Sequence, residues 1–311
     1  MPRIITLTPN PALDYSVEVD AVTPNRKLNA ENVRVDPGGG GVNVARAAHR
    51  LGAETLAIFP AGGPLGETLC ALVQAEGVAA RAICVNGQTR LSFAARDRRT
   101  KNEYRFGLPG AALSEAEAAM LLDALDKETS AGDFVVGSGS LPPTADPGAP
   151  RDLWARAAAI AARRQAKFAL DTTSGEAEAL AEGLYLIRKN KTELSTIAGR
   201  ELDWPDETAR FAQDFVASHK IERIVITHGG DGAIMASRKN FVRAPGLNVP
   251  IVSAVGAGDS FVAALCASLM RGDSDAQALR RAMAAASAAL MTPGTQLFDP
   301  GNVEKLMRDH G

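Results

Sequence analysis

A glycine-rich turn followed by an acidic residue is the segment of this sequence best suited to chemistry. It reads Val255-Gly256-Ala257-Gly258-Asp259-Ser260-Phe261, and apolar residues continue after it at helical spacing. Such a turn leaves the first N–H groups of a helix unpaired, and together with the helix dipole they form a site for an anion such as phosphate. Asp259 would stand at the mouth of this site, where its carboxylate could accept a proton from a hydroxyl. Ordinary helix capping by Asp259 is the alternative, and this segment alone leaves both open.

A second glycine-rich segment, Pro37-Gly38-Gly39-Gly40-Gly41-Val42-Asn43-Val44-Ala45-Arg46, precedes another helix-forming run. Four glycines in a row let a polar ligand lie against the main chain, and a tight turn alone rarely needs so many. The Asn43 amide offers a ligand both a donor and an acceptor. We therefore interpret this segment as a second part of a ligand site.

Several other familiar signatures are missing from the chain. No Gly-Lys dipeptide occurs, which excludes a Walker A loop, and no G-x-G-x-x-G supports a dinucleotide fold. The four histidines lack H-E-x-x-H spacing, and there is no G-x-S-x-G turn. A zinc protease and an α/β-hydrolase are therefore not expected.

The elements that must position these motifs alternate along most of the chain. Strand-length apolar runs at 55–59, 133–137, 167–171 and 223–227 are separated by helical segments, among them 151–165, 206–220 and a helix opened by a capping box at 114–117. This alternation predicts an α/β protein with a mostly parallel sheet covered by helices on both faces.

Two stretches break the alternation, because Tyr15 to Val35 and Thr89 to Gly107 alternate polar and apolar residues without a helical period. They predict antiparallel strands that form a small sheet outside the main domain. We assign residues 11–35 and 89–107 to this β-sheet lid, and residues 1–10, 36–88 and 108–311 to the core. Closure over a ligand site and pairing of protomers are two possible roles, and a merely decorative subdomain is the alternative.

The composition sets the class of partners. The 311 residues include 34 Lys plus Arg and 36 Asp plus Glu, a net charge of −2, which does not favour nucleic acid or an anionic membrane as a partner. The start of the chain has no apolar core of signal-peptide length, and Phe261 to Met270 is about half a membrane span. Three widely spaced cysteines fit reduced thiols. We expect a soluble, cytoplasmic protein that holds any anion by a local cluster.

At this point the sequence resembles the ribokinase-like PfkB carbohydrate kinases over essentially its whole length. The motifs that carry the resemblance are the segment from Pro37 to Arg46, the N-x-x-E element Asn190-Lys191-Thr192-Glu193, and Gly256-Ala257-Gly258-Asp259, in that order. Thr8 to Asp14 and Gly139 to Pro143 resemble the phosphosugar branch of the family. That branch contains 6-phosphofructokinase, 1-phosphofructokinase and tagatose-6-phosphate kinase, and the four consecutive glycines are most similar to PfkB-type 6-phosphofructokinase.

The resemblance implies a three-layer αβα core with a small β-sheet lid, and it implies roles for particular residues. Asp259 would be the catalytic base, and the N–H groups of Gly256, Ala257, Gly258 and Asp259 would stabilise charge on the transferring phosphoryl group. Sugar hydroxyls would be held by Asp14, Gly39, Gly40 and Asn43. Glu193, with Asn190, would organise Mg²⁺ through water near the phosphates of ATP, and Thr227, Gly229 and Gly232 would line the nucleotide site.

The phosphate of the sugar itself needs a cation, and Lys27 and Arg90 lie in the two lid stretches. Arginine suits phosphate because its guanidinium is a planar fork. Each residue alone could equally be a solvated surface charge, and the resemblance favours the binding role more firmly for Arg90. Arg96, Arg98, Arg99 and Lys101 are interpreted as a solvated hairpin tip.

These implications lead to the expected reaction, transfer of the γ-phosphoryl group of ATP to the 1-hydroxyl of fructose 6-phosphate. A tagatose-6-phosphate kinase or a 1-phosphofructokinase is the alternative within the branch, and a non-catalytic sugar-phosphate sensor is the alternative from another class. Arg188-Lys189-Asn190 replaces the usual Lys-Pro-Asn, Ala254 lacks a hydroxyl common at its position, and Asn29 replaces a basic residue. These departures concern nucleotide contacts, a monovalent-cation site for K⁺ and the grip on the sugar phosphate. We also expect a homodimer that pairs through the lid.

Overall fold

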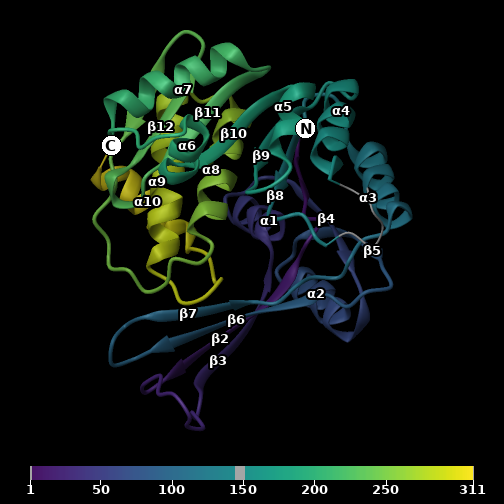
Figure 1. The fold of residues 1–311 in the computed structure, drawn as a ribbon, viewed down its shortest axis with the longest axis vertical. Helices are drawn as coiled ribbons and strands as arrows, with labels where there is room; N and C mark the ends of the chain where they lie inside the picture. Colours follow the sequence, from purple (N-terminus) through teal and green to yellow (C-terminus); the bar gives the residue numbers. More distant parts are fainter. Residues whose placement is uncertain (1, 144–150, 311) are drawn as a thin grey trace.

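A nine-stranded sheet forms the centre of the computed structural model, which describes residues 2–143 and 151–310 (Figure 1). The strand order is β13-β12-β11-β10-β9-β8-β1-β4-β5. All neighbours from β11 to β5 pair in parallel, while β12 and β13 each pair antiparallel with the strand before them. The strands are β1 (Ile4–Leu7), β4 (Thr55–Ala61), β5 (Ala79–Cys84), β8 (Phe134–Ser138), β9 (Lys167–Asp171), β10 (Leu184–Asn190), β11 (Ile221–Thr227), β12 (Ala233–Ser237) and β13 (Phe241–Ala244).

Helices cover both faces of this sheet because its strands are apolar on both sides. In β1, Ile5 and Leu7 pack into the core on one face and Ile4 into the core on the other. One face carries α1 (Gly40–Arg50), α2 (Gly63–Ala75), α8 (Ala257–Arg271), α9 (Asp275–Leu290) and α10 (Pro300–Asp309). The other carries α3 (Glu115–Glu128), α4 (Leu153–Arg163), α5 (Glu176–Glu182), α6 (Lys191–Ala198) and α7 (Asp206–Ser218). The predicted three-layer α/β fold with a mostly parallel sheet is confirmed, as is the capping box of Ser114 and Glu117 on α3.

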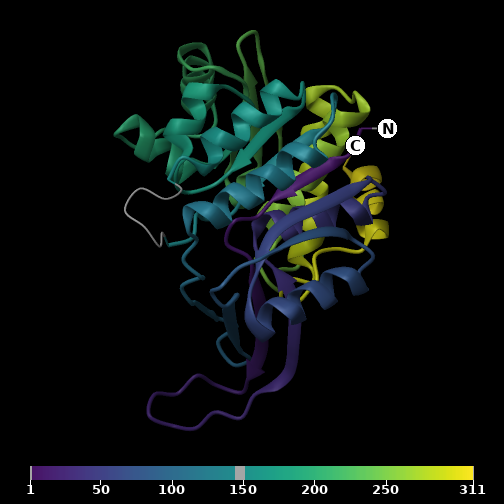
Figure 2. The ribbon, with the colours of Figure 1, turned by 90° about the vertical axis from the view of Figure 1, so that its right-hand side faces the viewer.

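A second sheet of four strands extends below the core (Figures 1 and 2). We call it the lid sheet; it consists of β2 (Ala12–Val19), β3 (Glu31–Gly38), β6 (Arg90–Asp97) and β7 (Glu103–Gly107), in the order β3-β2-β6-β7. The predicted antiparallel pairing is confirmed within each of the two stretches, β2 with β3 and β6 with β7, but was wrong between them, because β2 and β6 pair in parallel from Ala12 beside Arg90 to Val19 beside Asp97. Both strands leave the core in the same direction, and only their hairpin partners β3 and β7 run back.

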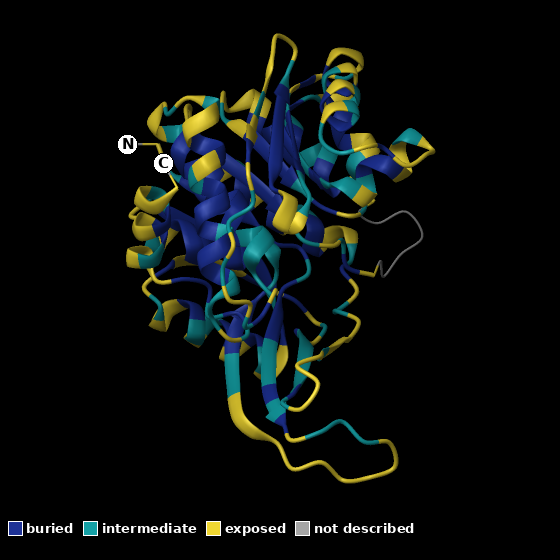
Figure 3. Ribbon diagram, turned by 90° about the vertical axis from the view of Figure 1, so that its left-hand side faces the viewer, coloured by how far each residue is buried: buried dark blue, intermediate teal, exposed yellow. Residues whose placement is uncertain are grey.

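The lid sheet is buried at its base and exposed at its far end (Figure 3). In β3, residues 31–33 are exposed whereas residues 36–38 are buried. The turn between β6 and β7 is held by Asp97, whose carboxylate accepts hydrogen bonds from the N–H groups of Arg99 and Thr100 and from Val22 N at 2.8–2.9 Å. Ser253 Oγ donates to Glu103 Oε1 at 3.1 Å, which joins the lid sheet to the loop before α8.

None of the helices in residues 2–143 and 151–310 is both long enough and apolar enough to cross a membrane. Cys70, Cys84 and Cys266 are free thiols.

Candidate active site

The two glycine-rich motifs meet at the edge of the sheet where the parallel strands end. This edge is where ligands bind in open α/β sheets. Both α1 and α8 begin here, and the side chains of their first turns are in contact, since Asn43 Nδ2 donates to Asp259 Oδ2 at 2.9 Å. The structure therefore brings together two predicted site residues that are 216 positions apart in the sequence.

Asp259 does not cap the helix in which it lies. The N-terminus of α8 has no side-chain cap, and the hydrogen bond found at the Asp259 carboxylate comes from Asn43, on another helix. Burial, and after it the negative charge of Asp171, raises the pKa of Asp259 to about 7, against the lowering effects of Asn43 and Arg188. A carboxyl group with a pKa near 7 can gain and release a proton at neutral pH.

The turn before Asp259 has the conformation that an anion site requires. Gly256 is in the left-handed region with φ of +79°, and Ala257 and Gly258 form the start of α8. Arg188 lies alongside, because a Cβ added to Gly258 would be 3.6 Å from Arg188 Nη1. The free N–H groups of the helix and the guanidinium thus face the same space, which favours a negatively charged group there.

A cleft of about 710 Å³ opens beside this turn. Its walls come from β10, β11, the loop after β13, α8 and α9, and they include the predicted nucleotide residues Thr227, Gly229 and Gly232 together with Arg188, Ala257 and Gly258. Gly232 has φ of +106°, and a Cβ there would be 2.2 Å from the carbonyl oxygen of Ala244. Only glycine fits this position, so the wall of the cleft depends on it.

The four consecutive glycines are required by close packing against the protein's own atoms. A Cβ at Gly38 would be 2.2 Å from Asp14 Oδ2, at Gly40 2.4 Å from Ser138 Oγ, and at Gly41 2.4 Å from Thr8 Oγ1. Gly39 has φ of +100° as the residue before α1. Gly39 and Gly40 are partly exposed and remain candidates for contact with a ligand through their backbone.

Asp14 and Arg90 lie together where the lid sheet joins the core. Burial raises the pKa of Asp14, while the nearby hydroxyl groups of Ser92 and Thr295 and the charge of Arg90 act in the opposite direction. Arg90 Nε donates weakly to the Asn10 carbonyl at 3.4 Å, and no ion pair or other hydrogen bond of its guanidinium is found within residues 2–143 and 151–310. A half-buried guanidinium with free donors beside a carboxyl group can bind a phosphorylated polyol.

Asn190 and Glu193 form a capping box at the start of α6. Glu193 N donates to Asn190 Oδ1 at 2.8 Å, and Asn190 N donates to Glu193 Oε2 at 2.8 Å. One carboxylate oxygen of Glu193 is left for another partner. In the described part of the chain no group of three or more His, Cys, Asp or Glu side chains could hold a metal ion. A single free carboxylate oxygen, that of Glu193, fits Mg²⁺, because this ion usually takes one or two carboxylates and fills its other positions with water and substrate phosphates.

Lys27 is the one predicted site residue that this chain does not bring to the others. It is exposed on the loop between β2 and β3, which projects from the far end of the lid sheet (Figures 2 and 3).

Sequence reasoning missed two charged residues of the site. Asp171 ends β9, and its charge acts on Asp259. Arg188 donates to Thr227 Oγ1 at 2.7 Å and to Asp171 Oδ1 at 3.3 Å, so it connects the ends of three neighbouring strands. The signal for both was their place at the carboxyl end of a strand, next to the predicted Asn190 and Thr227.

Comparisons with known proteins identify the family to which the sequence and the fold belong. The model of the pfkB family of carbohydrate kinases matches residues 8–301. The ATP-dependent 6-phosphofructokinase isozyme 2 of Mycobacterium tuberculosis is 41% identical over 304 residues, which cover 98% of this chain and 88% of that protein. A crystal structure of phosphofructokinase-2 from Escherichia coli in complex with substrates and products superimposes with a TM-score of 0.92 at 36% identity, covering 99% of both chains. A second structure of the E. coli protein, in complex with potassium, gives a TM-score of 0.92 at 35% identity with the same coverage. The chain belongs to the pfkB family of carbohydrate kinases.

Proposed function

We propose that this protein is an ATP-dependent 6-phosphofructokinase, which phosphorylates fructose 6-phosphate at its 1-hydroxyl to give fructose 1,6-bisphosphate. The observation that carries the proposal is the place of Asp259. Its carboxylate lies in the first turn of α8, directly after Gly258 in the wall of the cleft, close enough to Asp14 for that charge to act on it, and it is hydrogen-bonded by Asn43. The names of the M. tuberculosis and E. coli relatives support the choice of substrate.

In this proposal ATP occupies the cleft beside Thr227, Gly229 and Gly232, with its γ-phosphoryl group at the turn from Gly256 to Asp259. The sugar lies on Asp14, Asn43 and the backbone of Gly39 and Gly40. Its 6-phosphate is bound by the free donors of Arg90, since a guanidinium binds phosphate through two parallel hydrogen bonds.

Asp259 accepts the proton of the 1-hydroxyl as that oxygen attacks the γ-phosphorus, and the bond to the β-γ bridging oxygen breaks on the opposite side. Asn43 holds one carboxylate oxygen and leaves the other for the hydroxyl. The N–H groups at the start of α8 and the Arg188 guanidinium stabilise the charge on the transferring group, because fixed donors in a partly buried site act strongly. Mg²⁺ near Glu193 and Asn190 would neutralise charge on the nucleotide phosphates when bound.

ADP release with a panel of acceptors tests the proposal. Fructose 6-phosphate should be the best substrate, and ³¹P NMR of the product should show a second phosphate at the 1-position. Preference for tagatose 6-phosphate, or for fructose 1-phosphate, would replace it with one of the other kinases of this branch. Sugar-phosphate binding without ADP release from any acceptor would show a sensor and would refute the proposed activity.

We also propose a homodimer that pairs through the lid sheet. The support is a set of apolar side chains exposed on that sheet and next to it: Val33 is 60% exposed, Phe106 56% and Leu108 44%. Lys27 belongs to this proposal, because it can reach a sugar phosphate only across such an interface or after movement of its loop. Light scattering tests it, and a monomer at assay concentration would contradict it.

Potassium and the cellular location complete the proposal. We include K⁺ as a cofactor because the matched E. coli protein has been solved in complex with potassium. Exchange of K⁺ for Na⁺ in the assay should lower activity. A cytoplasmic location agrees with the three free thiols, and cell fractionation tests it.

A further inference from the structure

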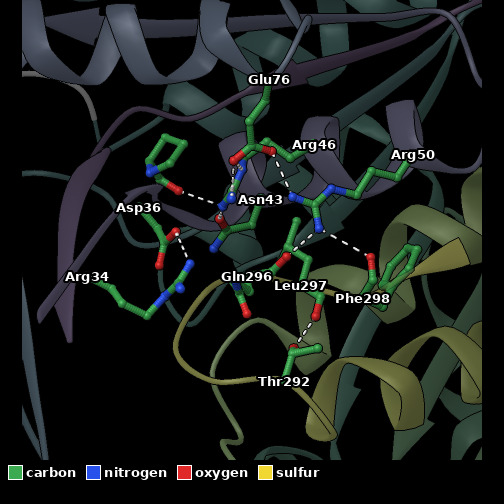
Figure 4. A network of polar contacts seen from close by, with 11 residues as sticks. Arg34, Asp36, Asn43, Arg46, Arg50, Glu76, Thr292, Gln296, Leu297 and Phe298 are labelled. Carbon is green, nitrogen blue, oxygen red and sulfur yellow. Dashed lines mark hydrogen bonds and ion pairs between the residues drawn. The ribbon is translucent and has the colours of Figure 1, made fainter. Parts of the chain in front are cut away.

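The Asn43 amide that donates to Asp259 is itself in contact with a buried arginine, Arg46 (Figure 4 shows Arg46 beside Asn43). The Arg46 side chain is completely inaccessible to solvent. Its Nη1 donates to the Pro37 carbonyl at 2.7 Å and to Asn43 Oδ1 at 2.9 Å. A buried guanidinium is costly unless its donors are satisfied, so these contacts define one arrangement of the side chain.

Arg46 thereby fixes which way the Asn43 amide faces. An amide has an acceptor oxygen on one side and a donor NH₂ on the other, and the two sides are nearly the same shape. With Arg46 donating to its oxygen, the NH₂ group must point the other way, where it donates to Asp259 Oδ2 at 2.9 Å. Without Arg46, the amide oxygen can turn toward Asp259 when that carboxyl group is protonated and accept its O–H, which favours the neutral form of Asp259.

Glu76, the residue directly after α2, holds Arg46 in place. Its Oε1 accepts from Arg46 Nε at 3.0 Å, and its Oε2 accepts from Arg50 Nη2 at 3.0 Å. Burial would raise the pKa of Glu76, but the hydrogen bond and charge of Arg46, and then Arg50, bring it below its usual value. Arg50 in turn donates to the carbonyl oxygens of Gln296 and of Phe298, the latter at 3.2 Å. Figure 4 shows Glu76 between the two arginines, one helical turn apart on α1.

We infer that Arg46 is a positioning residue for the phosphoryl transfer: it fixes the Asn43 amide so that its NH₂ group supports the ionised Asp259, and Glu76 holds Arg46 in that position. This inference rests on the proposed function, in which Asp259 is the base. It assigns a positioning role to a charge that is wholly inaccessible to solvent and does not line the cleft beside Thr227.

The groups that face Asp259 come from several elements. Asp171 on β9 and Asp14 on β2 are negative, Arg188 on β10 is positive, and Asn43 on α1 is neutral. Arg46 contacts only Asn43 among these. The charge of Arg46 also acts on Asp14. Loss of Arg46 should therefore act on Asp259 chiefly through the orientation of one amide, and it leaves the charges of Asp171 and Arg188 in place.

The test is the pH dependence of kcat/KM between pH 6 and pH 9 for wild type, Arg46→Met and Arg46→Lys, measured with the best acceptor of the panel above. A base that must be ionised makes the rate rise with pH through its pKa. Loss of the supporting NH₂ makes ionisation harder, so this rise should move about one pH unit toward alkaline pH, which is a tenfold loss at pH 6 and less than about twofold at pH 9. The second ionisation of the sugar phosphate, near pH 6, affects all variants equally.

Two further variants separate positioning from a general loss of structure. Arg50→Met removes an arginine from the same carboxylate without touching Asn43, and should lower the melting temperature without moving the pH profile. In the double variant Asn43→Ala with Arg46→Met, the profile should match that of Asn43→Ala alone, because residues that act through one contact are not additive.

If Arg46→Met does not fold, Arg46→Lys takes its place in the test of the pH profile, because lysine retains a positive charge opposite Glu76. A folded variant of Arg46 with the wild-type profile, or with the same loss of rate at every pH, would overturn the inference and leave the proposed kinase activity intact. A wild-type protein that phosphorylates no member of the panel would overturn both.

Discussion

Replacement of Asp259 by Asn should nearly abolish turnover and at the same time stabilise the protein. Asn has the same shape and its oxygen can still accept the hydrogen bond that Asn43 donates at 2.9 Å, so the site should keep its geometry. It cannot take a proton from the sugar hydroxyl. Loss of a general base lowers kcat by about 10²–10⁴-fold, and the KM of the sugar phosphate should change little.

The effect on stability follows from the raised pKa of Asp259. Burial, followed by the charge of Asp171, moves this pKa from 3.8 to about 7 in the folded protein. The unfolded chain therefore loses this proton near pH 4 while the folded protein retains it to about pH 7. Ionised Asp259 thus destabilises the folded state increasingly from pH 4 to pH 7 and fully above it. At 1.36 kcal/mol per pH unit, ionised Asp259 lowers the free energy of unfolding by at most about 4 kcal/mol. Water in the open cleft screens the charge and reduces this effect.

Thermal unfolding at pH 4.5 and at pH 8 measures this difference. Asp259→Asn should melt several degrees above wild type at pH 8, at about 2 °C per kcal/mol for a chain of this size, and close to wild type at pH 4.5. Asp214→Asn, an exposed carboxylate on α7, is the matched control and should show no such dependence. A gain in melting temperature that is equal at both pH values would refute the raised pKa, and near-normal turnover would refute the role of Asp259 as base.

Three other substitutions or treatments test the rest of the site. Gly38→Ala places a Cβ 2.2 Å from Asp14 Oδ2, so the displaced carboxylate should raise the KM of the sugar phosphate at least about tenfold and leave the KM of ATP unchanged in steady-state assays. Arg90→Met should raise the KM of the phosphosugar by about 10–100-fold, the worth of a hydrogen bond to a charged group, and an equal effect on unphosphorylated fructose would contradict its assignment to the phosphate. Chelation of Mg²⁺ by EDTA should stop turnover reversibly, and Glu193→Gln should increase the Mg²⁺ concentration needed for half-maximal rate; an unchanged requirement would remove Glu193 from the metal site.

The periodicity of the sequence was sufficient to predict the layers of the core. Buried strands of parallel sheets are apolar throughout, and the four interior runs recognised in the sequence correspond to β4, β8, β9 and β11. The start of α8 directly after Gly256 was also expected from local sequence. The parallel pairing of β2 with β6 was not, because alternation along one strand carries no information about the direction of its neighbour.

The site was predicted where its residues belong to short motifs and was missed where they depend on contacts between distant parts of the chain. Asp259 and Asn43 each follow a run of glycines that can be recognised in the sequence. Arg188 was noted only as a departure from a familiar tripeptide, yet it connects Asp171 and Thr227 at the ends of neighbouring strands. No local pattern distinguishes such an arginine from one that is exposed at the end of a strand.

Arg46 shows why this limit is physical. It follows Asn43 by three positions on α1. An arginine on a helix ordinarily extends into water and contributes little to the stability of the protein. Glu76, thirty residues later and directly after α2, accepts a hydrogen bond from the guanidinium and so lowers the cost of burying its charge. Once buried, the charge can no longer be satisfied by solvent, so it must use the Pro37 carbonyl and the Asn43 amide. The orientation of the group that supports the base is thus determined by a pairing between two helices, and only the folded chain specifies it.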